Sequence, residues 1–313
     1  MIVSSIKSLS IVIPVTERGD QLLEFLNGYY ESVSNMGLVY EFIIVLTPEY
    51  SELADGIKSK YEAKNIKVIL LNRNYGEAGV LKIGIDHAEF ENILTLPPYE
   101  QVSPSHIPRI IDEFGDHDAV VVNRWPRVDH KINRIQSAVF KGILKLMAYD
   151  VPKDPGCGIR LSKKEVFDDL KLYGDMHRFF FILAKQLGFD VTEVDIPQSK
   201  SDSYRRIYGF RTYLSRVLDV LTVGFLTRFN QKPLRFFGTG GALSFLIGST
   251  GLIYIAVERL MFDVAASDRP LLVLFSLFLV LGVQLIAIGL VGEILIFTSS
   301  KNNKEYRIKK IIN

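Results

Sequence analysis

Short apolar runs alternate with segments of helical spacing along the first 200 residues. Strand-like runs occupy residues 9–15, 41–47, 66–72, 92–96, 119–123 and 191–196. Apolar residues recur at helical spacing over residues 21–34, 76–90, 106–114, 132–148 and 175–187. This alternation predicts an α/β fold with a mostly parallel sheet covered by helices on both faces. Ligands of such sheets bind beyond the carboxyl ends of the strands, so the residues that follow each strand are the site candidates.

Two long apolar runs dominate the C-terminal part. Residues 236–257 and 271–292 each contain 22 positions without a formal charge. As a helix each run is roughly 33 Å long, which is enough to cross the hydrocarbon core of a membrane. Two buried helices in a soluble core are the alternative, but core helices rarely stay uncharged over such a length. We therefore predict a transmembrane helical hairpin over residues 236–298.

The flanking charges predict the orientation of this hairpin. Basic residues precede the first span and follow the second: Arg228, Lys232, Arg235, Lys301, Lys304, Arg307, Lys309 and Lys310. The intervening loop, 258–269, carries two arginines and three acidic residues. By the positive-inside rule both termini are cytoplasmic, and the chain is a multi-pass protein of the cell (inner) membrane. We expect no signal peptide, because the apolar run at 9–15 is too short for one.

Residues 201–235 are richer in basic side chains than the predicted α/β domain before them and the apolar runs after them. A polar, basic stretch is followed over 208–229 by arginines that alternate with apolar residues at helical spacing. This pattern predicts an amphipathic helix along the cytoplasmic face of the membrane, with an ordinary domain-packing helix as the alternative. The predicted organisation is a cytoplasmic domain (1–200), this juxtamembrane segment (201–235), the hairpin (236–298) and a basic tail (299–313).

Composition excludes several functions. Lys and Arg total 37 against 35 for Asp and Glu, and the net charge of +2 argues against nucleic-acid binding. The single cysteine, Cys157, excludes a disulfide framework and a metal site built from several cysteines. In the first span, Gly238, Gly240 and Gly241 would let another helix approach closely, so a homo-oligomer that packs through the spans is one option.

Seven short segments along the chain are candidates for comparison with known protein families. They read SIVIPV (10–15), NRNYGEA (72–78), GIDHA (84–88), DPGCGIR (154–160), GDMHRF (174–179), RIYGFRTY (206–213) and KPLR (232–235). Together with the hairpin they cover nearly the whole chain.

These motifs resemble family-2 glycosyltransferases of the GT-A (Rossmann-like) fold. The similar branch includes dolichyl-phosphate mannose synthase and bacterial polyprenyl-phosphate glycosyltransferases. The resemblance implies transfer of a sugar from a nucleotide-sugar donor to a polyprenyl-phosphate lipid at the cytoplasmic face, for cell-surface polysaccharide or glycan synthesis. It also implies a set of donor-binding residues at the strand ends: Pro14, Thr16, Glu17, Thr47, Arg73, Gly76, Tyr99 and Gln101.

Two acidic motifs of the family are missing. Residues 47–52 read TPEYSE where the family has DDGSxD, and residues 97–101 read PPYEQ where it has DADxQ. The resemblance implies a Mg²⁺ or Mn²⁺ ion on the donor diphosphate, but only Gln101 and Glu100 stand at the metal position. Glu17, Glu49 and Glu100 are the acids available to replace the lost ones. The two losses therefore predict either metal independence or an unusual metal site.

Glycosyl transfer requires positive charge beside the departing diphosphate. A divalent metal usually supplies it, and arginine or lysine clamps also do so. Arginines at predicted strand ends or in membrane-facing loops are Arg73, Arg124, Arg127, Arg134, Arg160, Arg178, Arg205 and Arg206. Those that coincide with family motifs are favoured over solvated surface arginines: Arg124, Arg160, Arg178 and Arg206. With Asp154 and His177, the first three form the expected catalytic group.

The acceptor needs cations but no general base, because a polyprenyl phosphate is already anionic and is itself the nucleophile. Arg205, Arg206, Arg211 and Tyr213 precede the membrane and are the candidates for binding its phosphate. His177 is expected either to touch one of the phosphates or to cap or pack at a helix start. Asp154 is expected to orient Arg160, with a turn role as the alternative.

Two functional hypotheses remain. The first is a working membrane glycosyltransferase, supported by the arginines and the motif His177-Arg178. The second is a catalytically inactive GT-A protein that binds a partner glycosyltransferase, a nucleotide or a lipid, supported by the joint loss of both acidic motifs. The first is favoured, because a pure scaffold has little physical need for so many arginines along one rim.

Overall fold

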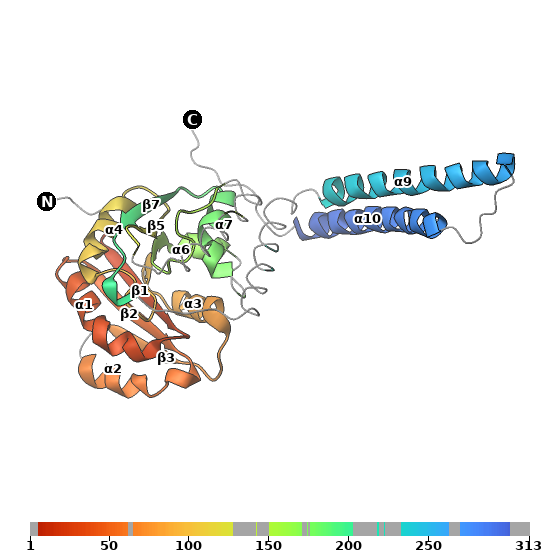
Figure 1. Ribbon diagram of the computed structural model, residues 1–313. Coiled ribbons are helices and arrows are strands. Elements are labelled where there is room, and N and C mark those ends of the chain that lie inside the picture. Colours follow the sequence, from red (N-terminus) through yellow and green to blue (C-terminus); the bar gives the residue numbers. More distant parts are fainter. Residues whose placement is uncertain are drawn as a thin grey trace. The chain divides into compact units, whose positions relative to one another are not determined.

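The computed structural model describes most of the chain (Figure 1). The described residues are 6–61, 65–127, 142, 150–170, 174, 176–202, 218, 222, 233–262 and 270–300. The chain divides into two compact units, Met1–Val223 and Gly224–Asn313, and each is described by itself. The predicted helices over 132–148 and 208–229 lie outside the described residues except for single positions, as do Arg134, Arg205, Arg206, Arg211 and Tyr213.

The first unit alternates strands with helices. Its strands are β1 (Ser8–Val15), β2 (Val39–Leu46), β3 (Ile66–Leu70), β4 (Asn92–Thr95), β5 (Ala119–Arg124), β6 (Arg160–Lys163) and β7 (Val191–Ile196). Its α-helices are α1 (Leu22–Ser34), α2 (Leu53–Tyr61), α3 (Gly76–Asp86), α4 (Ile107–Phe114), α6 (Lys164–Asp169) and α7 (Phe180–Gln186). Short 3-10 turns are η1 (Gly19–Gln21), η2 (Pro48–Tyr50), η3 (Pro104–His106), η4 (Met176–Phe179) and η5 (Lys200–Asp202).

The seven described strands form one sheet in the order β3-β2-β1-β4-β6-β5-β7. All neighbouring pairs are parallel except those of β6, which runs antiparallel to both β4 and β5. The predicted mostly parallel α/β sheet is confirmed. Three elements were not predicted: β6, α2 and α6. The residues of β6 read RLSK and hold two basic side chains, so they do not form an apolar run.

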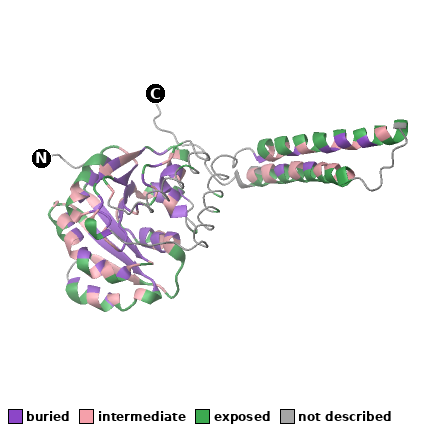
Figure 2. Cartoon of the chain, in the orientation of Figure 1, coloured by how far each residue is buried: buried purple, intermediate pink, exposed green. Residues whose placement is uncertain are grey.

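Helices cover both faces of the sheet (Figure 1). Alternate residues of the inner strands, such as Ile11, Ile13 and Ile44, belong to the core that includes Leu22 and Leu26 of α1. The intervening residues face α3 on the opposite side. Because both faces are covered, nearly every position of β1 and β2 is buried (Figure 2).

The second unit is a pair of long helices, α9 (Pro233–Phe262) and α10 (Pro270–Ser300). They contain the predicted spans 236–257 and 271–292, and both are long and apolar enough to cross a membrane. Most of their side chains are exposed (Figure 2), whereas the helices of a soluble core are mostly buried. The pair is therefore suited to anchor the chain in a membrane.

Glycines bring the two helices close together. A Cβ on Gly248 would lie 2.5 Å from the Leu279 nitrogen, and one on Gly241 would lie 2.8 Å from the Gly282 oxygen. At one end of the pair, Glu293 of α10 accepts a 3.4 Å hydrogen bond from the backbone nitrogen of Leu234. Of the three glycines expected to allow close approach, Gly241 packs within the hairpin, whereas a Cβ on Gly240 would meet nothing within 4 Å.

Helix α3 packs tightly on the sheet at Gly84, and this contact yields a prediction. A Cβ on Gly84 would collide with the Val12 side chain and would lie 3.2 Å from Val45 Cγ2. We expect Gly84→Ala to destabilise the first unit by about 1–3 kcal/mol, the usual cost of overpacking. The measurement is urea unfolding followed by the fluorescence of the single tryptophan, Trp125.

Gly56 in α2 provides the matched control. A Cβ there would lie 3.5 Å from Leu23 Cδ1, an ordinary contact, so Gly56→Ala is expected to be neutral or to stabilise by up to about 1 kcal/mol. Equal stabilities for the two variants would contradict the proposed packing of α3.

Candidate functional site

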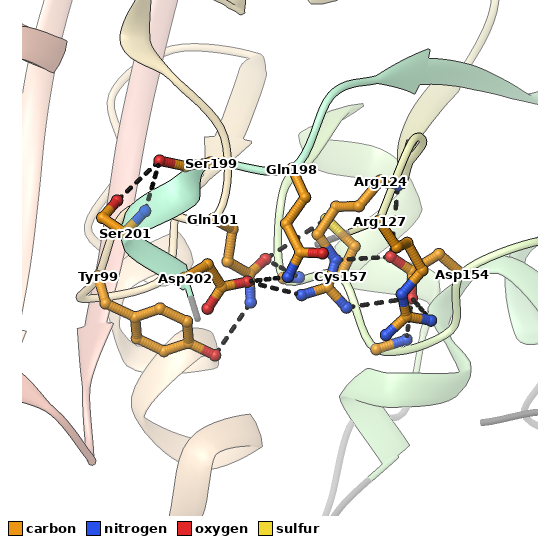
Figure 3. Close-up of polar contacts among 12 residues, drawn as sticks. Tyr99, Gln101, Arg124, Arg127, Asp154, Cys157, Gln198, Ser199, Ser201 and Asp202 are labelled. Carbon is orange, nitrogen blue, oxygen red and sulfur yellow. Dashed lines mark hydrogen bonds and ion pairs between the residues drawn. The ribbon is translucent and has the colours of Figure 1, made fainter. Parts of the chain in front are cut away.

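Polar side chains gather where several strands end at the same edge of the sheet. The carboxyl ends of β1, β4, β5 and β7 meet there, and antiparallel β6 brings its amino end to the same edge. We call one group of these side chains the rim network: Arg18, Tyr99, Gln101, Arg124, Asp154, Gln198 and Asp202. Figure 3 shows most of its members around Arg124.

Arg124, the last residue of β5, is the centre of the rim network. Its Nε and Nη2 donate to Asp154 at 2.6 and 3.1 Å, and its Nη1 donates to Asp202 Oδ2 at 3.0 Å. Arg124 is only 7% exposed, so these two carboxylates compensate a buried cation. A second cation is close, since Arg127 Nη1 lies 3.8 Å from Asp154 Oδ1.

Asp154 pairs with a different arginine from the one expected. It was predicted to orient Arg160, and that pairing is wrong: both carboxylate oxygens accept from Arg124. The physical reason is that the loop containing Asp154 lies against the end of β5, where Arg124 is the nearest cation. The alternative turn role is confirmed, because Asp154 Oδ1 also accepts a hydrogen bond from the Gly156 nitrogen at 3.2 Å.

The two carboxylates on Arg124 differ in their electrostatics. Burial raises the pKa of Asp154, but the attraction and hydrogen bonds of Arg124 outweigh it and leave that pKa lowered. For Asp202 burial is the stronger effect, and its pKa is raised despite Arg124, Gln198 and Arg18. Asp154 is thus the well-stabilised anion of the pair and Asp202 the poorly stabilised one.

Arg18 connects the loop after β1 to the same group. Its backbone is left-handed, with φ of 54°, and its guanidinium lies 3.6 Å from the centre of the Tyr99 ring. Nη1 donates to Asp202 Oδ1 at 3.3 Å, and Nη2 donates to Gln21 at 2.9 Å. The two oxygens of Asp202 therefore bind two arginines, one from the loop after β1 and one from the end of β5.

The family's metal ligands are expected in the segment after β4. There, the side chains of Glu100 and Gln101 form hydrogen bonds with other residues of the protein. Gln101 Oε1 accepts from the Gly158 nitrogen at 2.9 Å and from Cys157 Sγ at 3.4 Å, while Nε2 donates to Tyr99 Oη at 3.0 Å. Glu100 Oε1 accepts from Ser199 Oγ at 2.6 Å. Burial raises the pKa of the Cys157 thiol to about 11, so the thiol is a neutral donor at neutral pH.

These residues do not fit the divalent metal that the resemblance implies. Such ions require several hard oxygen ligands, mainly carboxylates. Within the described part of the chain, no three His, Cys, Asp or Glu side chains are grouped so that they could hold a metal ion. Glu17 and Glu49 are exposed, and a hydrogen bond with Thr47 lowers the pKa of Glu49.

The remaining residues expected to bind the donor lie at the ends of β1, β2 and β3. Pro14 and Thr47 are buried, and Thr47 Oγ1 donates to the Val15 carbonyl at 3.1 Å, which ties β1 to β2. Thr16 directly follows β1 and is half-buried. Arg73 is exposed, with its guanidinium 4.5 Å from the centre of the Tyr75 ring.

Gly76 opens α3 at φ of 76°, a conformation that side chains other than glycine rarely adopt. Its backbone nitrogen donates to Asn74 Oδ1 at 2.8 Å, which orders the turn into the helix.

A second group, which we call the histidine cluster, contains His177, Glu77 and Arg178. His177 is 3% exposed, and its Nε2 lies 3.0 Å from Glu77 Oε2 in the first turn of α3. Burial acts to raise the pKa of Glu77, but the hydrogen bond and charge of His177, with the charges of Arg178 and Arg160, lower it to about 2. The structure thus gives His177 a carboxylate partner that the sequence did not predict.

Arg160 lies between the two groups. Its Nη2 is 3.4 Å from the Cys157 carbonyl, and its guanidinium is 5.4 Å from the centre of the Phe180 ring. Burial lowers its pKa, and the charge of Glu77 opposes this effect. Of the five residues expected to be catalytic, Arg124 and Asp154 thus lie in the rim network, whereas His177 and Arg178 lie in the histidine cluster.

Sequence reasoning missed Arg18, Glu77, Gln198 and Asp202. Arg18 and Gln198 each follow a strand within three residues, and Asp202 belongs to the turn that comes next. The rule that directed attention to strand ends therefore covered them. The pairing of Arg18 with Asp202, 184 positions apart, had no signal in the sequence.

Comparisons with known proteins agree with the fold and with the family resemblance. Residues 10–171 match the family model described as glycosyl transferase family 2. An undecaprenyl-phosphate 4-deoxy-4-formamido-L-arabinose transferase of Klebsiella pneumoniae is 25% identical over 98% of this chain and 94% of its own length. The protein of the same name from Edwardsiella ictaluri is 24% identical over 98% and 95%.

Solved structures share the fold at low sequence identity. Mannosyl-3-phosphoglycerate synthase from Rubrobacter xylanophilus superposes with a TM-score of 0.51 at 14% identity, covering 71% of this chain and 73% of that one. The mannosyltransferase PcManGT from Pyrobaculum calidifontis, solved with GDP-Man and Mn²⁺, gives 0.50 at 12% identity, covering 94% and 79%.

The pairing of His177 with Glu77 yields a prediction about pH. An ionised Glu77 with a lowered pKa stabilises the folded chain above the usual carboxyl pKa of 4.5, and this contribution is lost as the pH falls toward about 2. We expect Glu77→Gln to lower the thermal midpoint at pH 7 by about 2–4 °C, and the difference from the unsubstituted chain to shrink below pH 4.5.

The control is Glu89→Gln, because the Glu89 side chain is 69% exposed and, among the residues that the structure describes, pairs only with Lys67. It is expected to leave the midpoint nearly unchanged at every pH. A deficit in Glu77→Gln that stays constant between pH 7 and pH 3 would contradict the ion pair.

Proposed function

This chain belongs to glycosyl transferase family 2, and on that basis we propose that it transfers a sugar from a nucleotide-sugar donor to a polyprenyl-phosphate lipid. One observation carries the proposal. Similarity to transferases named for undecaprenyl phosphate extends over 98% of the chain and so includes both long apolar helices. A membrane anchor on the transferase domain suits an acceptor that is itself held in the membrane.

The electrostatics of the sheet edge support the donor half of this reaction. As the diphosphate departs it gains negative charge, and guanidinium groups stabilise such charge through strong paired hydrogen bonds. Arg124 and Arg18 lie in the rim network, and Arg160 and Arg178 lie close enough to Glu77 to lower its pKa. Since the residues after β4 do not fit a divalent metal, we propose that arginines supply the positive charge.

The proposal for how the lipid acceptor binds is based on the amino-acid sequence. The lipid phosphate is the nucleophile, so no general base is required. We propose that Arg205, Arg206, Arg211 and Tyr213 bind this phosphate next to the membrane. By the distribution of basic residues around α9 and α10 the transferase domain is cytoplasmic, and its lipid-linked product feeds the synthesis of a surface polysaccharide or glycan.

A second candidate is a protein that binds a nucleotide sugar or a lipid without turnover. The internal hydrogen bonds of Glu100 and Gln101 favour it, because these residues stand where the family's catalytic metal is normally held. We consider transfer the better supported function, since arginines are able to replace the metal's charge.

The experiment uses the full-length chain, purified in detergent, with undecaprenyl phosphate and a panel of UDP-, GDP- and dTDP-sugars. Formation of a lipid-linked sugar is followed by mass spectrometry in EDTA and in Mn²⁺. We expect transfer from one donor class, with at least half of the rate retained in EDTA. Binding of a donor without product from any of them would contradict transfer and support the second candidate.

A pair of variants tests the role of the arginines. We expect Arg160→Ala to reduce the transfer rate by about 100-fold or more, the usual effect of removing one group that stabilises transition-state charge. Arg109→Ala, an exposed substitution on α4, is expected to leave the rate unchanged. Equal rates for both variants, at equal thermal midpoints, would exclude Arg160 from the reaction.

A further inference from the structure

The Asp202 carboxylate is bound as an incoming anion would be. Its Oδ1 accepts from Arg18 Nη1 at 3.3 Å, and its Oδ2 accepts from Arg124 Nη1 at 3.0 Å and from Gln198 Nε2 at 2.9 Å. Two guanidinium groups and an amide thus converge on one buried group that is 5% exposed. Proteins use the same combination of donors to bind phosphate groups.

Both arginines are fixed by contacts that do not involve Asp202. Arg124 is held on its other side by the bidentate pair with Asp154. Arg18 is held by the Tyr99 ring and by Gln21. If Asp202 moved away, the two Nη1 groups would stay in place and face the same position, so the site is organised in advance.

Asp202 is the member of this group that is most easily displaced. It ends η5, the short turn Lys200–Asp202, in which Lys200 and Ser201 are exposed. The pKa of Asp202 is raised because burial outweighs its favourable contacts, whereas that of Asp154 is lowered. Removing Asp202 would take one carboxylate away from Arg18 and Arg124 and leave Asp154, which pairs with Arg124 and lies close to Arg127.

We propose that Arg18, Arg124 and Gln198 form a binding site for a diphosphate, and that Asp202 occupies this site until the diphosphate displaces it. The identification of that diphosphate as part of a nucleotide-sugar donor rests on the proposed function.

The first test measures the binding of inorganic pyrophosphate to the full-length chain in EDTA by calorimetry. Because Asp202 competes for the site, Asp202→Asn is expected to bind pyrophosphate on the order of 10-fold more tightly than the unsubstituted chain. Asp154→Asn, which changes the charge equally, is expected to show no gain. The double variant Arg18→Gln/Asp202→Asn is expected to lose the gain.

Several results would overturn the proposal. Unchanged or weaker binding in a folded Asp202→Asn variant would show that Asp202 is no competitor, and an equal gain in Asp154→Asn would show a general charge effect. Inorganic phosphate is run in parallel, and tighter binding of phosphate than of pyrophosphate would overturn the assignment to a diphosphate.

A second test leaves the arginines and Asp202 intact and so does not depend on how their variants fold. A nitroxide label on Ser201→Cys reports the mobility of η5, and the native Cys157 is buried and does not compete for the label. Pyrophosphate is expected to raise the mobility of this label and to leave a label on Ser59→Cys, exposed on α2, unchanged. Saturating pyrophosphate with no change at Ser201→Cys would overturn the displacement.

The two proposals fail separately. If pyrophosphate displaces Asp202 but no sugar is transferred, the diphosphate site stands and the transferase function falls. If sugar is transferred but pyrophosphate neither gains affinity in Asp202→Asn nor mobilises the label, the transferase function stands and the displacement falls.

Discussion

The buried ion pair between Arg124 and Asp154 is the interaction on which the site depends. A guanidinium that is 7% exposed is stable only when its charge is matched, and truncating one partner of such a pair costs about 3–5 kcal/mol. The pair fixes the end of β5 against the loop that contains Asp154, and it leaves Nη1 of Arg124 directed toward Asp202. Through Asp202, the loops after β1 and β7 join the same network.

Much of the fold follows from the sequence, because buried parallel strands need continuous apolar runs and the helices between them repeat at helical spacing. Strand β6 did not follow, since a four-residue strand with two basic side chains has no such run. The position of the site was predictable once the parallel strands were recognised, because ligands of such sheets bind beyond the carboxyl ends of the strands. The choice of partners was not, because Arg124 and Asp154 are 30 positions apart and only the folded loops determine which arginine Asp154 meets.

The missing acids and the pair of long apolar helices show how the structure adds detail to an inference made from the sequence. The sequence revealed that the acids of the family motif are lost, and the structure adds that the remaining Glu100 and Gln101 already bind neighbours.

In the helix pair, the prediction of close helix approach at glycine holds for Gly241, but its contact is made with Gly282 of the same chain. Small side chains in α9 therefore serve the pairing of α9 with α10.

Together these features support our proposal that arginines replace a metal in this family-2 glycosyltransferase domain. The most direct measurement of this claim is an experimental structure of the full-length chain with pyrophosphate in EDTA. The account predicts an anion between the guanidinium groups of Arg18 and Arg124, with Asp202 moved away and Asp154 still paired to Arg124. An anion bound elsewhere, with Asp202 still between the two arginines, would contradict it.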